Sequence, residues 1–250
     1  MPKRTDHEML EELRKYDTPS ITNVVATYPD SENCLGLYNP WTENWYTDTS
    51  IRCMYPELGR TVGYAVTCVF SVPDPNYSRL SFMDVIDALD ASPKPTILIL
   101  QQKFPPELAN KVGLAGSIMT TAMQSVGCIG VISNGPSRDI EAIREMGFQY
   151  MLSGASAGHG AMAVQAVNVP VHVAGMDVAP GEMIHMDENG ACKFPADKME
   201  AVLIKAKALI EEEDVRLAAL RKAKTAAEIR AIFGGHSYSH DEQDKEEKNS

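Results

Sequence analysis

Apolar runs and amphipathic segments alternate along the middle of the chain. Residues 59–72 are rich in β-branched residues and predict a strand, whereas residues 80–89 place their apolar side chains at helical spacing. Residues 95–102 form a continuous apolar run, which indicates a strand that is covered on both faces. Strands and helices in this order are typical of an α/β protein.

The same alternation continues to residue 195. The periodicity and the turn residues predict further elements in this order: a helix over 117–126, a strand over 128–133, a short helix over 139–146, a strand over 148–152, a Gly/Ser/Ala-rich loop over 153–160 and a strand over 170–175. Residues 178–195 predict paired strands joined by a turn at Glu188-Asn189-Gly190, because Asn-Gly is a strong hairpin signal.

Helical patterns flank this core, which spans about residues 60–210. They cover residues 6–16, 18–26, 196–213 and 225–233. We therefore predict a single α/β domain over residues 1–235 with extra terminal helices, followed by a disordered acidic tail over 236–250. Residues 28–58, which include Trp41 and Trp45, form a long irregular stretch, for which a subunit contact and a structural cover carry equal weight.

The composition limits the kinds of molecule that this protein can be expected to bind and the compartment in which it functions. Apolar residues make up 44% and charged residues 23% of the 250 residues, as in an ordinary globular protein. The net charge of -11 argues against nucleic acid as a partner, because a phosphate backbone requires a basic face. No stretch approaches the roughly 20 apolar residues of a membrane span, and the N-terminus does not read as a secretory signal. The five cysteines are widely spaced without a CxxC pair, which favours reduced thiols in a cytoplasmic protein.

A glycine followed by a helix is the first element of candidate chemistry. Gly116 precedes the predicted helix, so the N–H groups of Ser117, Ile118 and Met119 have no partner within it. A helix start of this kind attracts anions. Taken alone, however, a glycine before a helix is more often only a turn.

An Arg-Asp pair follows the next predicted strand. Arg138 can hold a carboxylate through two N–H donors, and Asp139 can hold a hard divalent cation through oxygen. The alternative is a plain helix start, in which Asp139 caps the helix and Arg138 lies in solvent. Because the ends of neighbouring strands in an α/β sheet open into one crevice, we favour a site for a small oxo-acid bound on a metal.

Other candidates are weaker. His159 in the loop 153–160 could carry a proton or bind a ligand, although a lone loop histidine is more often a surface polar group. That loop lacks the strand and helix context of a dinucleotide fingerprint, and Ser156 has no G-x-S-x-G setting. The chain has no H-E-x-x-H pattern, which argues against a zinc protease site of that type.

Residues 116–139, GSIMTTAMQSVGCIGVISNGPSRD, resemble the signature of the family that contains the RraA proteins (regulator of ribonuclease activity A) and the 4-hydroxy-4-methyl-2-oxoglutarate aldolases. Residues 169–195 resemble the second block of that family through Pro180-Gly181-Glu182, Asp187, Gly190 and Pro195. Residues 59–68, GRTVGYAVTC, resemble its first core strand. The resemblance covers roughly residues 60–210.

This resemblance implies a swivelling α/β fold, a β/β/α sandwich, assembled as homotrimers or dimers of trimers with active sites between subunits. In the aldolase members, the backbone matching Gly116 to Met119 and the side chain matching Arg138 bind the pyruvate part of the substrate, and the residue matching Asp139 binds Mg²⁺ or Mn²⁺. The implied activity is that of a carbon–carbon lyase of the class II pyruvate aldolase type. It would cleave a 4-hydroxy-2-oxo acid, or decarboxylate oxaloacetate, and release pyruvate, with Arg138 neutralising charge in the transition state.

Two positions depart from the family pattern. Ser117 stands where aldolase members often carry an acid or amide, and Asn134 stands where the strand usually ends in Asp. The loss of two acids would weaken the surroundings of a metal. The alternative hypothesis is therefore a non-catalytic RraA-like protein that binds a ribonuclease or another protein partner. A methyltransferase is a third and weaker alternative.

Overall fold

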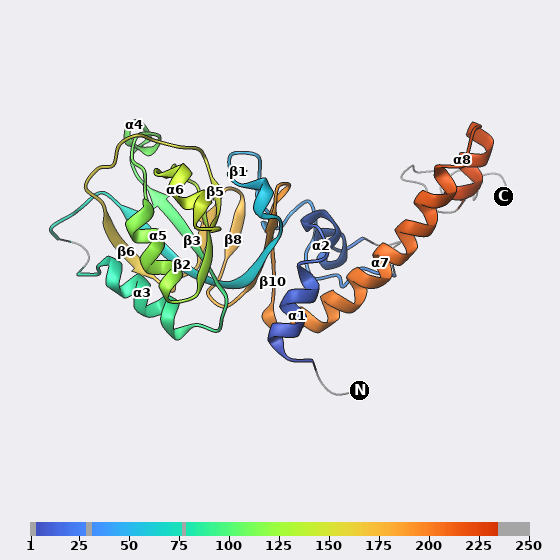
Figure 1. The fold of residues 1–250 in the computed structure, drawn as a ribbon, viewed down its shortest axis with the longest axis horizontal. Helices are drawn as coiled ribbons and strands as arrows, with labels where there is room; N and C mark the ends of the chain where they lie inside the picture. The colour runs from blue at the N-terminus through green and yellow to red at the C-terminus, as the bar shows by residue number, and fades with distance from the viewer. Residues whose placement is uncertain (1–3, 29–31, 77–78, 235–250) are drawn as a thin grey trace.

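The computed structural model describes residues 4–28, 32–76 and 79–234. A mixed sheet with its covering helices forms one end of the molecule, and a long C-terminal helix extends away from the other end (Figure 1). The strands are β1 (Arg52–Cys53), β2 (Thr61–Ser71), β3 (Thr96–Lys103), β4 (Cys128–Ser133), β5 (Gln149–Leu152), β6 (Ala163–Val167), β7 (Val171–Val173), β8 (Met176–Val178), β9 (Met183–Asp187) and β10 (Gly190–Phe194).

The helices follow the strands in alternation through the middle of the chain. They are α1 (Asp6–Leu13), α2 (Thr18–Val25), α3 (Phe82–Ala91), α4 (Pro106–Ala109), α5 (Ser117–Ser125), α6 (Ile140–Glu145), α7 (Met199–Leu220) and α8 (Ala226–Phe233), with short 3₁₀ turns at Pro56–Leu58 and Ala196–Lys198. Within the described residues, no helix is both long and apolar enough to cross a membrane.

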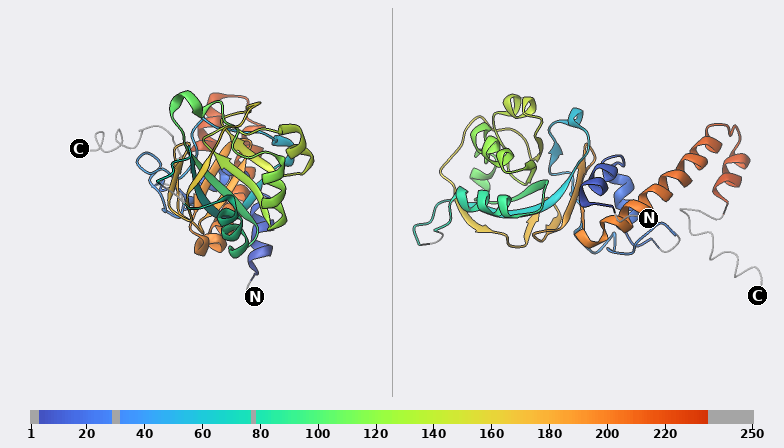
Figure 2. Two further views of the ribbon diagram at one scale, coloured as in Figure 1. Left: turned by 90° about the vertical axis from the view of Figure 1, so that its left-hand side faces the viewer. Right: turned by 60° about the horizontal axis from the view of Figure 1, so that its bottom comes forward.

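The main sheet has eight strands, seven of them in the order β1-β5-β4-β3-β2-β9-β10, with β6 added beside β2. Strands β2, β3, β4 and β5 run parallel, whereas β1, β6, β9 and β10 pair antiparallel with their neighbours. All of β2 is buried. Strand β9 pairs with its beginning, β6 with its end and β3 along its other edge, and its side chains pack in clusters on both faces of the sheet. The sheet curls until it is nearly closed (Figure 2).

The apolar side chains of β3 pack on both faces of the sheet. Leu98 and Leu100 pack in the cluster formed with α3 and α5, whereas Ile97 and Ile99 pack in the cluster formed with the β7–β8 hairpin. Neighbouring side chains of a strand point to opposite faces, so a strand covered on both sides must be apolar throughout. The predicted α/β class is therefore confirmed, while the swivelling β/β/α arrangement stays a prediction.

The terminal helices form a second packing unit against β9 and β10. Leu13 of α1, Val24 of α2 and Val202 of α7 share a cluster with Trp45 and Phe194. Beyond this cluster, α7 continues to Leu220 rather than ending near residue 213, and α8 folds back beside it (Figures 1 and 2). We call residues 210–233 the C-terminal arm.

The irregular stretch 28–58 is partly a structural cover. Trp45 is buried and stacks on Tyr38, with ring centroids 5.5 Å apart. Trp41, by contrast, is 87% exposed. Short elements that the apolar pattern did not predict include β1, α4 and β6. The predicted disordered tail over 236–250 lies outside the described residues, and the prediction of one domain over 1–235 stays a prediction.

Candidate active site

The loops that follow β3, β4 and β5 are joined by backbone hydrogen bonds at one edge of the sheet. The N–H of Leu114 donates to the carbonyl of Pro136 at 3.0 Å, and the N–H of Ser156 donates to the carbonyl of Ser137 at 2.8 Å. Because these strands are parallel, their carboxyl ends meet at the edge where α/β proteins usually bind ligands. The two halves of the segment 116–139 therefore meet there.

Asp139 links the start of α6 to the start of α5. Its carboxylate Oδ2 accepts hydrogen bonds from the N–H of Ser117 at 2.8 Å and from the Ser117 hydroxyl at 3.0 Å. The bond from the Ser117 N–H is the main cause that lowers the pKa of Asp139, so the carboxylate is held ionised. Although Asp139 stands at the N-cap position of α6, its side chain makes no cap bond there. The simple helix-cap alternative thus does not describe this side chain.

The backbone of Asp139 is in the left-handed region, with φ at 57°. A residue other than glycine rarely adopts this conformation, and such positions cluster at functional sites. Here the left-handed turn carries the carboxylate away from its own helix and toward Ser117. The strained turn is therefore what joins the two helix starts.

Position 116 requires glycine because a larger side chain would not fit there, and not because of the backbone conformation. Its φ of -91° is accessible to any residue, but an added Cβ would lie 2.6 Å from Oδ2 of Asp139. The same Cβ would lie 3.4 Å from Cγ of Arg138. A side chain at position 116 would therefore displace the carboxylate from its bond to Ser117.

Arg138 lies beside the same carboxylate. Its Nε is 3.3 Å from Oδ1 of Asp139, and the two side chains are 34% and 30% exposed. An ion pair with this exposure contributes at most about 1 kcal/mol to stability. The pair therefore leaves guanidinium N–H groups on an accessible surface, where they can serve a ligand.

The helix start is only partly available to an anion. The N–H of Ser117, predicted to face a ligand, donates to Asp139 instead. Among the described residues, the N–H groups of Ile118 and Met119 have no hydrogen-bond partner. The Ile118 side chain is 86% exposed, so this turn of α5 lies at the surface. Two of the three predicted N–H donors thus remain for a ligand.

Asn134 has a structural role at the end of β4. Its Oδ1 accepts from the N–H of Gln102 at 2.6 Å, and its Nδ2 donates to the carbonyl of Gln102 at 3.1 Å. The side chain thereby extends the ladder between β3 and β4 by one pair. Both polar atoms of Asn134 are engaged, so it does not replace the acid that aldolase members carry there.

Buried hydroxyl groups hold the turn before α5, and the sequence alone did not point to them. The hydroxyl of Tyr150 donates to the carbonyl of Ala115 at 3.1 Å, and the Ser137 hydroxyl donates to the same carbonyl. Thr120 bonds the Tyr150 hydroxyl at 2.5 Å and the Gly116 carbonyl at 2.9 Å. These residues come from β5, α5 and the loop after β4, so only the fold brings them together.

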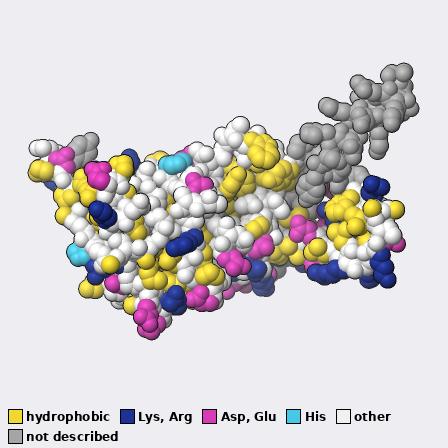
Figure 3. Space-filling view, turned by 90° about the horizontal axis from the view of Figure 1, so that it is seen from above, with side chains coloured by type: hydrophobic (Ala, Val, Ile, Leu, Met, Phe, Trp, Pro, Cys, Tyr) yellow, Lys and Arg dark blue, Asp and Glu magenta, His cyan; other side chains and the backbone are white. Residues whose placement is uncertain are grey.

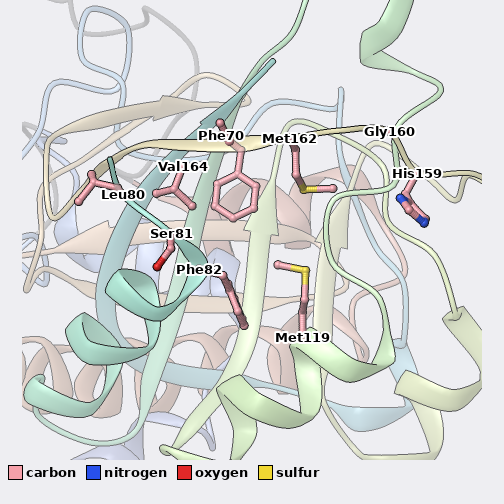
Figure 4. A pocket seen from close by; sticks show the side chains of 10 residues that line it. Phe70, Leu80, Ser81, Phe82, Met119, His159, Gly160, Met162 and Val164 are labelled. Carbon is pink, nitrogen blue, oxygen red and sulfur yellow. The ribbon is translucent and has the colours of Figure 1, made fainter. Parts of the chain in front are cut away.

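Three of the described histidines lie outside this cluster. His159 lines a neighbouring hollow that also contains Met119 (Figure 4). His172 pairs with Asp177 at 2.6 Å on the exposed side of the β7–β8 hairpin. His185 is buried, where Nδ1 bonds the Thr18 hydroxyl at 2.9 Å and Nε2 bonds the Leu13 carbonyl at 3.2 Å.

Asp139 is the residue that could hold a divalent cation. Within the described part of the chain, no three His, Cys, Asp or Glu side chains gather in a way that could bind a metal. Mg²⁺, however, is commonly bound by one or two carboxylates, with water and substrate oxygens completing its shell. The Asp139 oxygens retain lone pairs beyond those used by Ser117 and Arg138. The residues therefore fit a cation whose other ligands are water and substrate.

A family model described as "RraA-like: Aldolase/RraA" matches residues 38–192, which include the whole of this site. A curated protein of Halalkalibacterium halodurans, named "Putative 4-hydroxy-4-methyl-2-oxoglutarate aldolase", is 28% identical over 104 residues, or 41% of this chain and 50% of that protein. Protein DlpA of Legionella pneumophila is 23% identical over 141 residues, or 55% of this chain and 22% of that protein. The match thus spans half or less of the length of these curated relatives.

A solved structure has a similar fold. It is a Streptomyces coelicolor protein, RraAS2, described as an unusual member of the family of RraA inhibitors of RNase ES. The two chains are 17% identical, with a TM-score of 0.65 over 88% of this chain and 99% of that one. This similarity concerns the fold alone.

Proposed function

The chain belongs to the RraA-like (Aldolase/RraA) family, and from that premise we propose that it is a divalent-metal-dependent lyase. Its substrate would be a 2-oxo acid, such as a 4-hydroxy-2-oxo acid or oxaloacetate, and one product would be pyruvate. The observation that carries this proposal is the contact of Asp139 with Ser117 beside Arg138. That contact brings a carboxylate, a guanidinium group and the first turn of a helix together at one edge of the sheet.

Each group has a role in this proposal. The side chain of Asp139 holds Mg²⁺ or Mn²⁺, which when bound polarises the 2-oxo group as a Lewis acid. Arg138 binds the substrate carboxylate and neutralises the negative charge that develops as the carbon–carbon bond breaks. The free N–H groups of Ile118 and Met119 bind and orient the same carboxylate.

The chemical balance of the reaction is simple. In retro-aldol cleavage, a water molecule or a nearby acidic side chain in its ionised form takes the proton of the 4-hydroxyl, the bond between C3 and C4 breaks, and the electron pair moves toward the 2-oxo group. Protonation at C3 then gives pyruvate and a second carbonyl compound. In decarboxylation of oxaloacetate the same electron pair comes from the bond to the departing carboxylate. In this proposal both reactions develop negative charge at the 2-oxo group, which Arg138 would help to neutralise.

A non-catalytic, RraA-like protein that binds a ribonuclease or another protein is the second candidate. One observation favours it: Asn134 is fully engaged with Gln102 and supplies no second carboxylate near Asp139. This candidate predicts no metal-dependent turnover and a stable complex with a protein partner. The accessible Arg138 and the carboxylate held ionised favour the lyase.

We propose further that the chain forms a homo-oligomer, a trimer or a dimer of trimers, with sites between subunits. The C-terminal arm supports this, since it extends beyond the body and carries exposed apolar side chains. These are Val215 (72% exposed), Leu217 (44%) and Ile229 (41%). Figure 3 shows hydrophobic side chains gathered at the far end of the arm, with Lys and Arg around them.

The lyase is tested by a screen for pyruvate release from oxaloacetate and from 4-hydroxy-2-oxo acids. The reactions contain Mg²⁺ or Mn²⁺, with and without a chelator. We expect metal-dependent turnover that falls at least about a hundredfold in Arg138→Ala and in Asp139→Ala. Arg144→Ala is the matched control, because Arg144, in the last turn of α6, pairs with Glu57 of the 3₁₀ turn Pro56–Leu58 rather than with Asp139. Turnover that survives the chelator or both site substitutions contradicts the proposal.

A further inference from the structure

We propose that the substrate carries an apolar group on the side opposite its 2-oxo-carboxylate, and that this group occupies the hollow beside Met119. The inference rests on the proposed function and specifies the substrate class of the same site. Among 4-hydroxy-2-oxo acids, it selects those with an aromatic or branched aliphatic substituent on C4 and disfavours those with a second carboxylate there.

The hollow has an apolar lining. Its volume is about 460 Å³, within the range of small-molecule sites. Six large apolar side chains from β2, β6, α3, α5 and the loops next to them line it, and Figure 4 shows how they lie: Phe70, Leu80, Phe82, Met119, Met162 and Val164. An aromatic ring or a branched chain placed here would exchange water for these side chains.

The few polar groups that line the hollow offer no cationic partner of the Lys or Arg type to a second carboxylate of the substrate. None of the lining residues is Lys or Arg, and His159 is the one ionisable residue among them. Ser81 is occupied, because its hydroxyl donates to Asp84 at 2.9 Å and accepts from the N–H of Met83 at 3.2 Å. A carboxylate placed in this hollow would lose hydration without gaining a charged partner, which is costly.

The hollow adjoins the proposed carboxylate site at two points. Met119 supplies a free N–H in the first turn of α5, and its side chain lines the hollow. On the other side, His159 and Gly160 follow Gly158, whose carbonyl accepts from the N–H of Gly113 at 3.0 Å. A Cβ on Gly113 would lie 3.3 Å from Cβ of Arg138, so this loop also borders the arginine. One ligand can therefore reach from Arg138 past Met119 into the hollow.

The test compares three stable 2-oxo acids by isothermal titration calorimetry in Mg²⁺: 2-oxobutanoate, 2-oxo-4-phenylbutanoate and 2-oxoglutarate. We expect the phenyl compound to bind at least about tenfold more tightly than 2-oxobutanoate, because burial of the ring removes apolar surface from water. We expect 2-oxoglutarate to bind no more tightly than 2-oxobutanoate. The same titrations are repeated with Arg138→Ala, Leu80→Glu and Leu108→Glu.

Leu80→Glu places a charge in the hollow, whereas Leu108→Glu is the matched control at a leucine of similar exposure on α4 (39% and 37%). The proposal predicts that Leu80→Glu removes the gain from the phenyl group while 2-oxobutanoate binding stays within about twofold. The control should leave both affinities unchanged.

The outcomes separate the inference from the proposed function. If 2-oxobutanoate binds in an Arg138-dependent manner but the phenyl group brings no gain, the inference is wrong and the proposed site stands. The inference is also wrong if 2-oxoglutarate binds most tightly, or if Leu80→Glu changes only the oligomeric state, which would make the hollow a subunit contact. If no 2-oxo acid binds, the proposed function fails and the inference with it.

Discussion

Substitution of Gly116 by alanine tests the contact between the two helix starts. The added Cβ would lie 2.6 Å from Oδ2 of Asp139, and ordinary contact begins at 3.4 Å. The carboxylate must therefore retreat by about 0.8 Å, or the turn before α5 must shift by a similar distance. Either movement lengthens the 2.8 Å bond from the N–H of Ser117.

The expected loss of activity follows from this displacement. A hydrogen bond to a charged acceptor contributes about 1.5–3 kcal/mol, which corresponds to roughly 10- to 100-fold in rate. A misplacement of about 1 Å can by itself cost about a hundredfold. We therefore expect metal-dependent pyruvate release by Gly116→Ala to fall between about tenfold and a hundredfold. The free energy of unfolding should also fall, by about 1 kcal/mol, because alanine is a poorer helix N-cap than glycine.

The assay is oxaloacetate decarboxylation in Mg²⁺, with thermal unfolding measured in parallel. Gly158→Ala is the matched control in an adjacent loop, since its Cβ would meet only the carbonyl of Lys111 at 3.8 Å. We expect the control to keep the wild-type rate. Wild-type activity in Gly116→Ala would refute the argument that the Asp139 carboxylate must lie at this position.

Three further predictions concern other parts of the molecule. Burial lowers the pKa of His185 from 6.5 to about 4, so the folded protein binds fewer protons than the unfolded chain between these values. The free energy of unfolding should therefore fall by up to about 3 kcal/mol as the pH drops from 6.5 to 4, and urea titrations of His185→Gln should lack this slope. Arg138→Lys keeps the charge but loses the two-pronged donor, so pyruvate release should fall at least about tenfold while Arg144→Lys retains the wild-type rate. Val215→Glu places a charge on the C-terminal arm and should reduce the oligomer mass measured by light scattering, whereas Lys207→Glu, on the same helix, should not.

The order of strands and helices could be predicted because local patterns determine it. The apolar run at 95–102 became β3, whose alternate side chains serve two different clusters. The Asn-Gly turn likewise joins β9 to β10. The length of α7 could not be predicted, because the helix extends past the cluster that its apolar residues help to form and ends in the exposed arm.

The meeting of the two halves of residues 116–139 could be predicted, but the contacts between them could not. Parallel strands bring the ends of β3 and β4 to one edge, which motif spacing is sufficient to indicate. By contrast, the bond from Ser117 to Asp139 depends on a left-handed residue that no composition rule predicts. The buried hydroxyl of Tyr150 on the Ala115 carbonyl also depends on the tertiary structure.

The most direct test of the proposed site is a Mn²⁺ titration followed by electron paramagnetic resonance, with and without pyruvate. We expect wild-type protein to bind one Mn²⁺ per chain, more tightly when pyruvate is present. Asp139→Asn should lose the bound ion, because an amide replaces the carboxylate, while Arg138→Ala should lose only the enhancement by pyruvate. Equal Mn²⁺ binding by wild-type protein and Asp139→Asn would contradict the central claim that this carboxylate holds the metal.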